Sequence, residues 1–80
     1  MDTREAVQNR IIELCTAKRW PINAVANYSG VPPSTMKNIV GGQSKNPGIV
    51  TIKKICDGLE ISLTEFFDTD TFRNLEQEIK

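Results

Sequence analysis

The sequence predicts an all-α fold of five short helices, followed by a sixth at the C-terminus. Apolar residues recur at spacings of three and four within short segments, and glycine or proline separates most of these segments. No segment alternates apolar and polar residues between hairpin turns, as strands do. A chain of 80 residues has room for one modest core. We therefore expect one domain in which short helices cross around a single core.

The first helix is expected at about residues 3–18. Asp2 precedes it and Glu5 follows three residues later, which is the pattern of a capping box. The apolar residues of this segment fall at helical spacing on one face and comprise Val7, Ile11, Leu14 and Cys15.

Two short helices follow, separated by a tight turn. Pro21 begins the second helix and Gly30 ends it. The third is expected at about residues 33–40, before a pair of glycines. Its two leading prolines fit a helix start, because Pro33 suits the first helical position and Pro32 favours an extended backbone before it. The two apolar faces consist of Ile22, Val25 and Ala26, and of Met36, Ile39 and Val40.

Residues 21–40 together are expected to form a helix–turn–helix. Gly30 can adopt the positive φ that a tight turn between helices needs, and Ala26 is small where the helices approach each other. Val31 is expected to point inward. On geometry alone, a purely structural corner between two helices is an alternative.

Three further helices are expected after the loop QSKNPG. The fourth covers IVTIKKICDGLE and stops at Gly58. Its inward residues are Val50, Ile52, Ile55, Cys56 and Leu59. The fifth, in SLTEFF, opens with a second capping-box pattern formed by Ser62 and Glu65. The sixth, in TDTFRNLEQEIK, has a narrow apolar stripe of Phe72, Leu75 and Ile79.

The net charge is zero, but the charges are segregated along the chain. From Asp57 onward, seven acidic residues face two basic ones. No acidic residue lies between Glu13 and Asp57, and that interval contains Lys18, Arg19, Lys37, Lys45, Lys53 and Lys54. A basic middle and an acidic end indicate a surface that faces a polyanion, with chance clustering of solvated charges as the alternative.

Several functional classes are disfavoured. The chain has no histidine, and its two cysteines lack CxxC spacing, so we expect no metal or other cofactor. Cys15 and Cys56 are interpreted as buried thiols in a reducing cytoplasm. No paired carboxylates or glycine-rich phosphate loop accompany a nucleophile, so neither an enzyme nor a small-molecule site is expected. No apolar run approaches the ~20 residues of a membrane span and no signal-peptide pattern opens the sequence, which favours the cytoplasm.

The segment AVANYSGVPPSTMKNIVGGQSKNPGIVTIKKICDGLEISLTEFF resembles the Cro/repressor-type (XRE-like) helix-turn-helix family. Val25 and Ala26 match the apolar pair of the second helix, SGV matches the turn, and STMKNI matches the recognition helix. NP with a following apolar helix and ISLTEFF match the closing part. With RIIELCTAKRW upstream, the resemblance spans about residues 7–67. We accordingly expect a phage-repressor-like DNA-binding domain at residues 1–68 and a helical extension at 69–80.

The resemblance implies that the recognition helix, at about residues 33–40, lies in the DNA major groove. The residues then expected to face the bases are Pro33, Ser34, Lys37 and Asn38. Of these, Pro33 can offer only an apolar contact, because it has no hydrogen-bond donor. Contacts to the DNA backbone are expected from Asn23, Thr35, Gln43, Ser44, Lys45 and Asn46.

Two positions depart from the family pattern. Pro21 and Ile22 stand where many members have polar residues, so one phosphate contact is expected to be lost. Cys15 and Val40 stand where many members have an arginine–glutamate ion pair. Replacement of both partners by apolar residues is physically coherent, and we predict that Cys15 and Val40 pack together.

The resulting hypothesis is a small bacterial or phage transcriptional regulator, most simply a repressor, that binds double-stranded DNA sequence-specifically. A homodimer would read two half-sites about 34 Å apart. The residues expected at its interface are Phe66, Phe67, Phe72, Leu75 and Ile79. Alternatively, these residues cap the core, and the two roles are not exclusive. The alternative is a protein-interaction module on the same scaffold, or an antitoxin whose acidic end binds a toxin.

Overall fold

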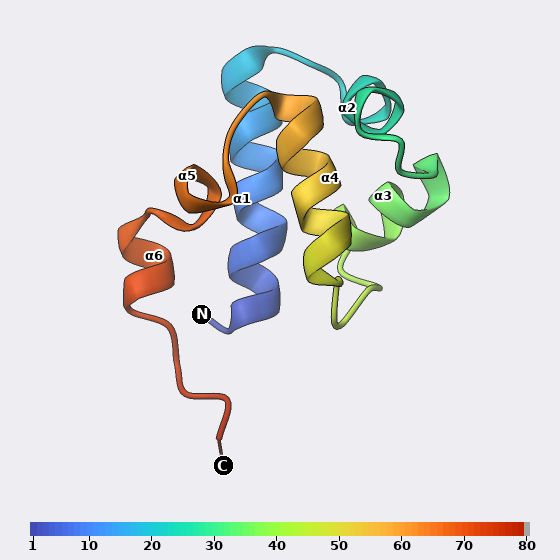
Figure 1. Ribbon diagram of the computed structural model, residues 1–80. Coiled ribbons are helices and arrows are strands. Elements are labelled where there is room, and N and C mark those ends of the chain that lie inside the picture. Colours follow the sequence, from blue (N-terminus) through green and yellow to red (C-terminus); the bar gives the residue numbers. More distant parts are fainter. Residues whose placement is uncertain (80) are drawn as a thin grey trace.

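The computed structural model describes residues 1–79, and this part of the chain folds into six helices without strands. The helices are α1 (Thr3–Lys18), α2 (Ile22–Ser29), α3 (Pro33–Val40), α4 (Ile49–Leu59), α5 (Leu63–Phe67) and α6 (Asp70–Arg73). Helices α1 and α4 occupy the centre of the view in Figure 1, with α2 and α3 to one side and α5 and α6 to the other. Helix α2 packs against α3 and α4, α1 contacts α3 and α6, and α4 contacts α5. The predicted all-α class and the first five helices are confirmed.

Helix α1 has the predicted cap, and it also secures α5. The side chain of Asp2 accepts a hydrogen bond from the backbone N–H of Glu5 at 2.8 Å. Further along α1, Arg10 donates to two carbonyl oxygens of α5, those of Phe66 at 2.8 Å and Glu65 at 2.9 Å. Carbonyls in the last turn of a helix lack intrahelical partners, and here the Glu65 carbonyl otherwise accepts only from the Asp68 N–H at 3.4 Å within residues 1–79. Arg10 therefore supplies charge-assisted hydrogen bonds to the end of α5.

Helices α1, α2 and α4 end with the same geometry. At each end one residue adopts a left-handed conformation, and the N–H of the next residue donates to a carbonyl five positions earlier at 3.0 Å. The left-handed residue of α2 is Gly30, with a φ of 66°, as the sequence predicted. In the other two helices it is Arg19, with a φ of 58°, and Glu60, with a φ of 61°. A residue with a Cβ is disfavoured in this conformation, so only α2 ends without strain.

The core collects apolar residues from the first five helices. Its largest fully buried side chains are Phe66, Ile11, Met36, Ile55, Leu59, Val25 and Cys56. Both cysteines are buried free thiols, and burial raises the pKa of each. Val31, in the turn after α2, is buried as predicted.

The predicted stop of the fourth helix at Gly58 is wrong, because α4 continues to Leu59 and Gly58 is buried within it. A Cβ at this position would clash with the side chain of Ser29 on α2 and lie 3.0 Å from the Ser29 backbone nitrogen. Gly58 therefore permits the close approach of α2 and α4. The hydroxyl of Ser29 is buried at this contact and has no hydrogen-bond partner within residues 1–79.

The predicted inward position of Val50 is also wrong, because 67% of this residue is exposed. The inward stripe of α4 consists of Ile52, Ile55, Cys56 and Leu59. At 3.6 residues per turn, a residue two places before Ile52 points to the opposite side of the helix. Val50 is therefore on the outer face of the first turn of α4.

The predicted sixth helix is much shorter than its apolar stripe suggested. Helix α6 covers Asp70–Arg73 only, so Leu75 and Ile79 lie outside it, and Ile79 is 87% exposed. One turn suffices to place Phe72 against the rings of Phe66 and Phe67, at centroid distances of 6.0 and 4.9 Å. The residues after it have too little apolar surface to support further turns by burial.

The segment after α6 instead lies against the start of α1. The hydroxyl of Thr3 donates to Glu78 at 2.9 Å, and the N-terminal amine lies 3.6 Å from Glu76. Phe66 is fully buried, so it belongs to the core and its predicted place in a dimer interface is wrong. Phe67 and Phe72 pack against the core but remain partly exposed.

Candidate nucleic-acid interface

The recognition face lies on the solvent side of α3. Pro33, Ser34, Lys37 and Asn38 are all exposed, at positions that share one side of a helix. Met36 and Ile39 are buried on the opposite side and fix α3 on the core. All four residues predicted to face bases are thus brought together on one accessible surface.

The two prolines start α3 as predicted. Pro32 is the N-cap, with φ −54° and ψ 137°, and Pro33 occupies the first helical position. No side chain caps this helix end. The beginning of α3 is therefore set by the restricted backbone of the two prolines, which places Ser34 in the first turn.

The loop after α3 folds back onto the end of that helix. The carbonyl oxygen of Asn38 accepts from the backbone N–H groups of Gln43 and Ser44, at 2.9 and 3.0 Å. The side-chain amide of Gln43 faces the carbonyl oxygens of Asn38 and Gly41, at 3.3 and 3.2 Å, so its nitrogen belongs on that side. Gln43, Lys45 and Asn46 are exposed, while Ser44 is half-buried. Of the three exposed residues, Gln43 is the one whose amide is directed at the end of α3.

Helix α1 supports the same loop through two residues that the sequence did not single out. Gln8 donates through Nε2 to the carbonyl oxygen of Val40 at 2.8 Å, and accepts from an Arg4 nitrogen at 3.4 Å. The other guanidinium nitrogen of Arg4 lies 3.8 Å from Glu5. More than thirty residues separate Gln8 from Val40 in the sequence, and no local pattern could have indicated this contact.

Two further predictions concern the edges of this surface. Asn23 is exposed in the first turn of α2, and Thr35 is half-buried on α3. Ile22 packs against the core, and the loss of a phosphate contact at that position stays a prediction. Cys15 is buried and Val40 packs on the core, but a direct contact between the two stays a prediction.

The basic side chains of this face are not neutralised. Among residues 1–79, no ion pair includes Lys37, Lys45 or Lys54. Lys18 lies over the Trp20 ring, 4.8 Å from its centroid, and Lys53 pairs with Asp57. Lys37 on α3 and Lys45 in the loop after it therefore contribute positive charge beside the exposed polar face of α3.

A short helix ending in Gly30, a second helix with an exposed polar face and a basic loop constitute the geometry of a DNA-reading helix–turn–helix. A model of the Cro/C1-type helix-turn-helix DNA-binding domain matches residues 10–71. The chain belongs to this family. The Cro/C1-type match includes α1 from Arg10 onward and ends within α6.

Two relatives agree with this assignment. The chain is 40% identical over 63 residues to the HTH-type transcriptional regulator SlrR of Bacillus subtilis (strain 168), covering 78% of this chain and 41% of that protein. The Cro/C1-type domain thus spans less than half the length of that curated relative. The crystal structure of the prophage Lp1 protein 11 is similar with a TM-score of 0.80 and 38% identity, over 94% of this chain and 100% of that one.

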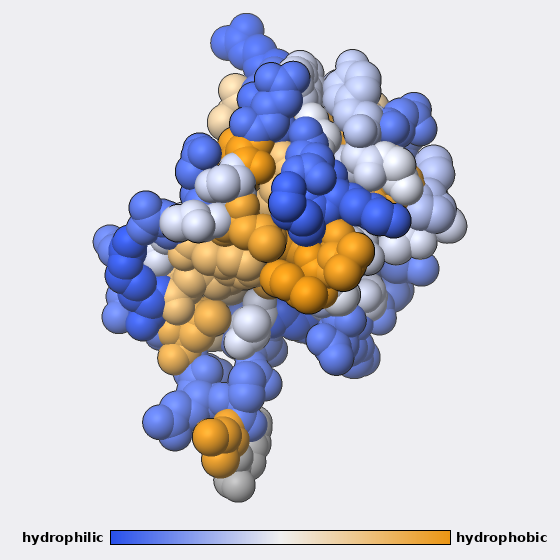
Figure 2. All heavy atoms as spheres, viewed as in Figure 1, coloured by the Kyte–Doolittle hydropathy of each residue, from blue (hydrophilic) through white to orange (hydrophobic). Residues whose placement is uncertain are grey.

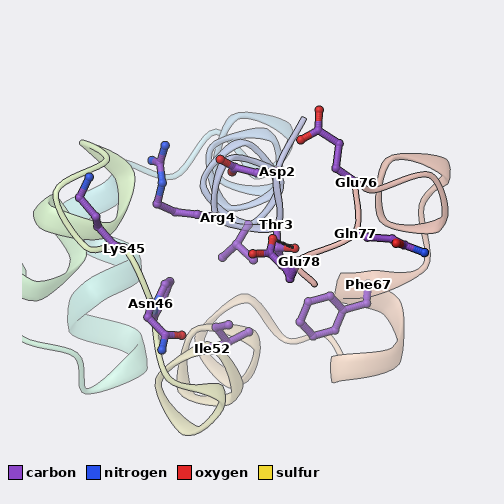
Figure 3. A pocket seen from close by; sticks show the side chains of 12 residues that line it. Asp2, Thr3, Arg4, Lys45, Asn46, Ile52, Phe67, Glu76, Gln77 and Glu78 are labelled. Atoms are coloured by element: carbon purple, nitrogen blue, oxygen red, sulfur yellow. Dashed lines mark hydrogen bonds between the residues drawn. The ribbon is translucent and has the colours of Figure 1, made fainter. Parts of the chain in front are cut away.

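A pocket adjoins this surface and shares Lys45 and Asn46 with it. The pocket has a volume of about 760 Å³ and lies between the start of α1, the loop at residues 45–47 and the segment at residues 76–78 (Figure 3). Its walls carry both cations and carboxylates. Within residues 1–79, no cluster of side chains could hold a metal ion, and no helix is long and apolar enough to cross a membrane.

Proposed function

We propose that this Cro/C1-type domain binds double-stranded DNA sequence-specifically and acts as a small bacterial or phage transcriptional regulator, a repressor. The observation that carries the proposal is the exposed polar face of α3, with Lys37 on it and Lys45 in the loop that follows, neither of them in an ion pair among residues 1–79. The family assignment and the named role of SlrR support it. The chain would act by binding in the cytoplasm, where its DNA is, and not as an enzyme.

The readout is assigned to residues 33–38 of α3. Asn38 can form two hydrogen bonds with adenine, and Lys37 can donate to guanine O6 and N7. Ser34 can donate or accept, and Pro33 is suited to the methyl group of thymine. Because Met36 and Ile39 are buried, α3 enters the groove as a rigid element.

The DNA backbone is assigned to the residues around this helix. Lys45 and Asn46 are the best placed because both are exposed and neither side chain makes a hydrogen bond or an ion pair within residues 1–79. Ser44, Asn23 and Thr35 are assigned lesser roles. Gln43 would have to turn away from the carbonyl oxygens at the end of α3 before it could donate to a phosphate.

We assign the DNA-bound form to a homodimer. One recognition helix reads only a few base pairs, and a two-fold dimer reads two half-sites about 34 Å apart. Figure 2 displays apolar side chains gathered from the α5–α6 region to the first turns of α4. The exposed or partly exposed apolar residues of these elements include Phe67, Phe72, Leu75, Ile49 and Val50. Ile79 is exposed beyond them.

Selection of bound sequences from a random duplex pool would test the function. We expect a two-fold symmetric site. We also expect the logarithm of the binding constant to fall linearly with the logarithm of the salt concentration, with a slope of about −0.9 for each neutralised phosphate. Lys37→Ala and Asn38→Ala should change the preferred bases, whereas Lys45→Ala should weaken all sequences equally. Absence of binding to any duplex at low salt would favour the second candidate, a module that binds a protein partner, such as a toxin, through the acidic residues after α4.

A further inference from the structure

Arg4 reaches the DNA-facing loop from the first turn of α1. If Gly42 had a Cβ, that atom would lie 3.3 Å from a guanidinium nitrogen of Arg4. Gly42 also has a φ of 84°, which favours glycine. The backbone just after the recognition helix and the Arg4 side chain are therefore in close proximity, although they are far apart in the sequence.

The position of Arg4 is linked to that of α3. Arg4 donates to Gln8 at 3.4 Å, and Gln8 donates to the last carbonyl of α3, that of Val40, at 2.8 Å. The side chain of Arg4 is 28% exposed, so its guanidinium is held by the protein while part of it still faces solvent. An ordered and partly exposed arginine loses little side-chain entropy when it binds an anion.

Arg4 and Lys45 extend to the same side of the molecule, one from α1 and the other from the loop (Figure 3). Both residues line the same pocket as Asn46. The nearest carboxylates have other partners or are partly solvated: Glu5 is 3.8 Å from Arg4 with its side chain 48% exposed, and Asp2 is engaged as the cap of α1. The other two carboxylates of the pocket are also engaged, since Glu76 lies 3.6 Å from the N-terminal amine and Glu78 accepts from Thr3.

We infer that Arg4 donates to a DNA phosphate adjacent to the one contacted by Lys45, so that α1 and the loop clamp one strand beside the recognition helix. The inference rests on the proposed DNA binding. The planar guanidinium can donate two parallel hydrogen bonds to a phosphate. Its present contact with the partly exposed Glu5 carboxylate, at 3.8 Å, is weaker than such a pair of bonds. Because a phosphate carries no sequence information, Arg4 strengthens binding without changing base preference.

The test compares Arg4→Gln with Arg73→Gln on the selected duplex, using affinities measured from 50 to 300 mM salt. Loss of one phosphate contact should lower the salt slope by about 0.9 and weaken binding roughly eightfold at 0.1 M salt. Arg73→Gln removes the same charge from α6, where the guanidinium is paired with Asp68 and Asp70, and should leave the slope unchanged. Arg4→Lys should retain most of the slope because it retains the cation.

Three outcomes would overturn the inference while leaving DNA binding intact. Arg4→Gln could leave the slope unchanged, or Arg73→Gln could lower it equally, which would indicate a general field effect. Alternatively, Arg4→Lys could lower the salt slope of binding as much as Arg4→Gln does, which would indicate a structural role through Gln8. If the unmodified chain binds no duplex at all, the proposed function itself fails, and the two failures are thus distinguished.

Discussion

The helix–turn–helix and the segment after α4 are held to the same core by different means. Helix α3 is fixed by buried Met36 and Ile39, and its end is secured by hydrogen bonds from Gln8 and the following loop. Helix α6 is fixed by partly exposed Phe72 and by solvated ion pairs. Buried apolar groups contribute far more stability than exposed ion pairs, so the reading helix is the better anchored of the two.

The two regions also differ in how they use charge. On α3 and the loop after it, lysines are left without ion-pair partners, whereas Arg73 on α6 is paired with Asp68 and Asp70. The zero net charge therefore combines a basic segment and an acidic segment of the chain and does not describe either one. A polyanion would be attracted to the unpaired lysines of α3 and the loop after it, whereas the paired charges of α6 contribute little to the field.

The largest expected loss of stability follows from truncating the buried side chain that fixes α3 on the core. Met36→Ala should destabilise the fold by about 2–5 kcal/mol because it leaves a cavity beneath α3. Phe72→Ala, at the half-buried anchor of α6, should cost less. Urea denaturation of both variants, followed by circular dichroism, measures the difference. A larger loss for Phe72→Ala would contradict the ranking of the two anchors.

The next effect concerns the contact that attaches the helix–turn–helix to α4. Gly58→Ala should destabilise by about 1–3 kcal/mol, because the added methyl group meets Ser29, even though alanine is the better helix former. Ser29→Ala removes a buried hydroxyl without a partner and should be neutral or stabilising. Thermal unfolding of the two single variants tests this pair, and an increase in stability for Gly58→Ala would refute the close contact.

A smaller effect compares two helix ends of equal geometry. Gly30→Ala should destabilise by about 1 kcal/mol, because alanine is strained in the left-handed conformation at the end of α2. Glu60→Gly should stabilise the end of α4 by up to about 1 kcal/mol for the same reason. Chemical denaturation of both variants should give shifts of opposite sign, and shifts of the same sign would exclude strain as the cause.

The smallest effect is expected in the acidic segment. Arg73→Gln breaks two solvated ion pairs and should change the stability by less than about 1 kcal/mol. The free energies of unfolding of this variant and the unmodified chain should differ less at high salt than at low salt, because salt screens exposed ion pairs. A loss as large as that of Met36→Ala would mean that α6 is anchored by its charges and not by Phe72.

The sequence predicted the helix–turn–helix well because its signals are local. Pro33 and Gly30 mark a helix start and a helix end through their own backbone preferences, and the observed bounds of α1 and α3 agree with the predicted ones. The four residues of α3 that the family resemblance implied for base contacts share its exposed side, as helical spacing predicts. The same reasoning failed at Gly58, since a glycine that ends a helix and a glycine that admits a neighbouring helix look alike in sequence.

The amino-acid sequence by itself determined where the helices of the reading unit begin and end, and which polar side chains they expose. Those features depend on backbone conformations and on hydrogen bonds between residues a few positions apart. Only the tertiary structure decided that α6 stops after one turn, that Ser29 meets Gly58, and that Arg4 lies beside Gly42. These features depend on which distant surfaces meet when the core closes, and no local pattern encodes that choice.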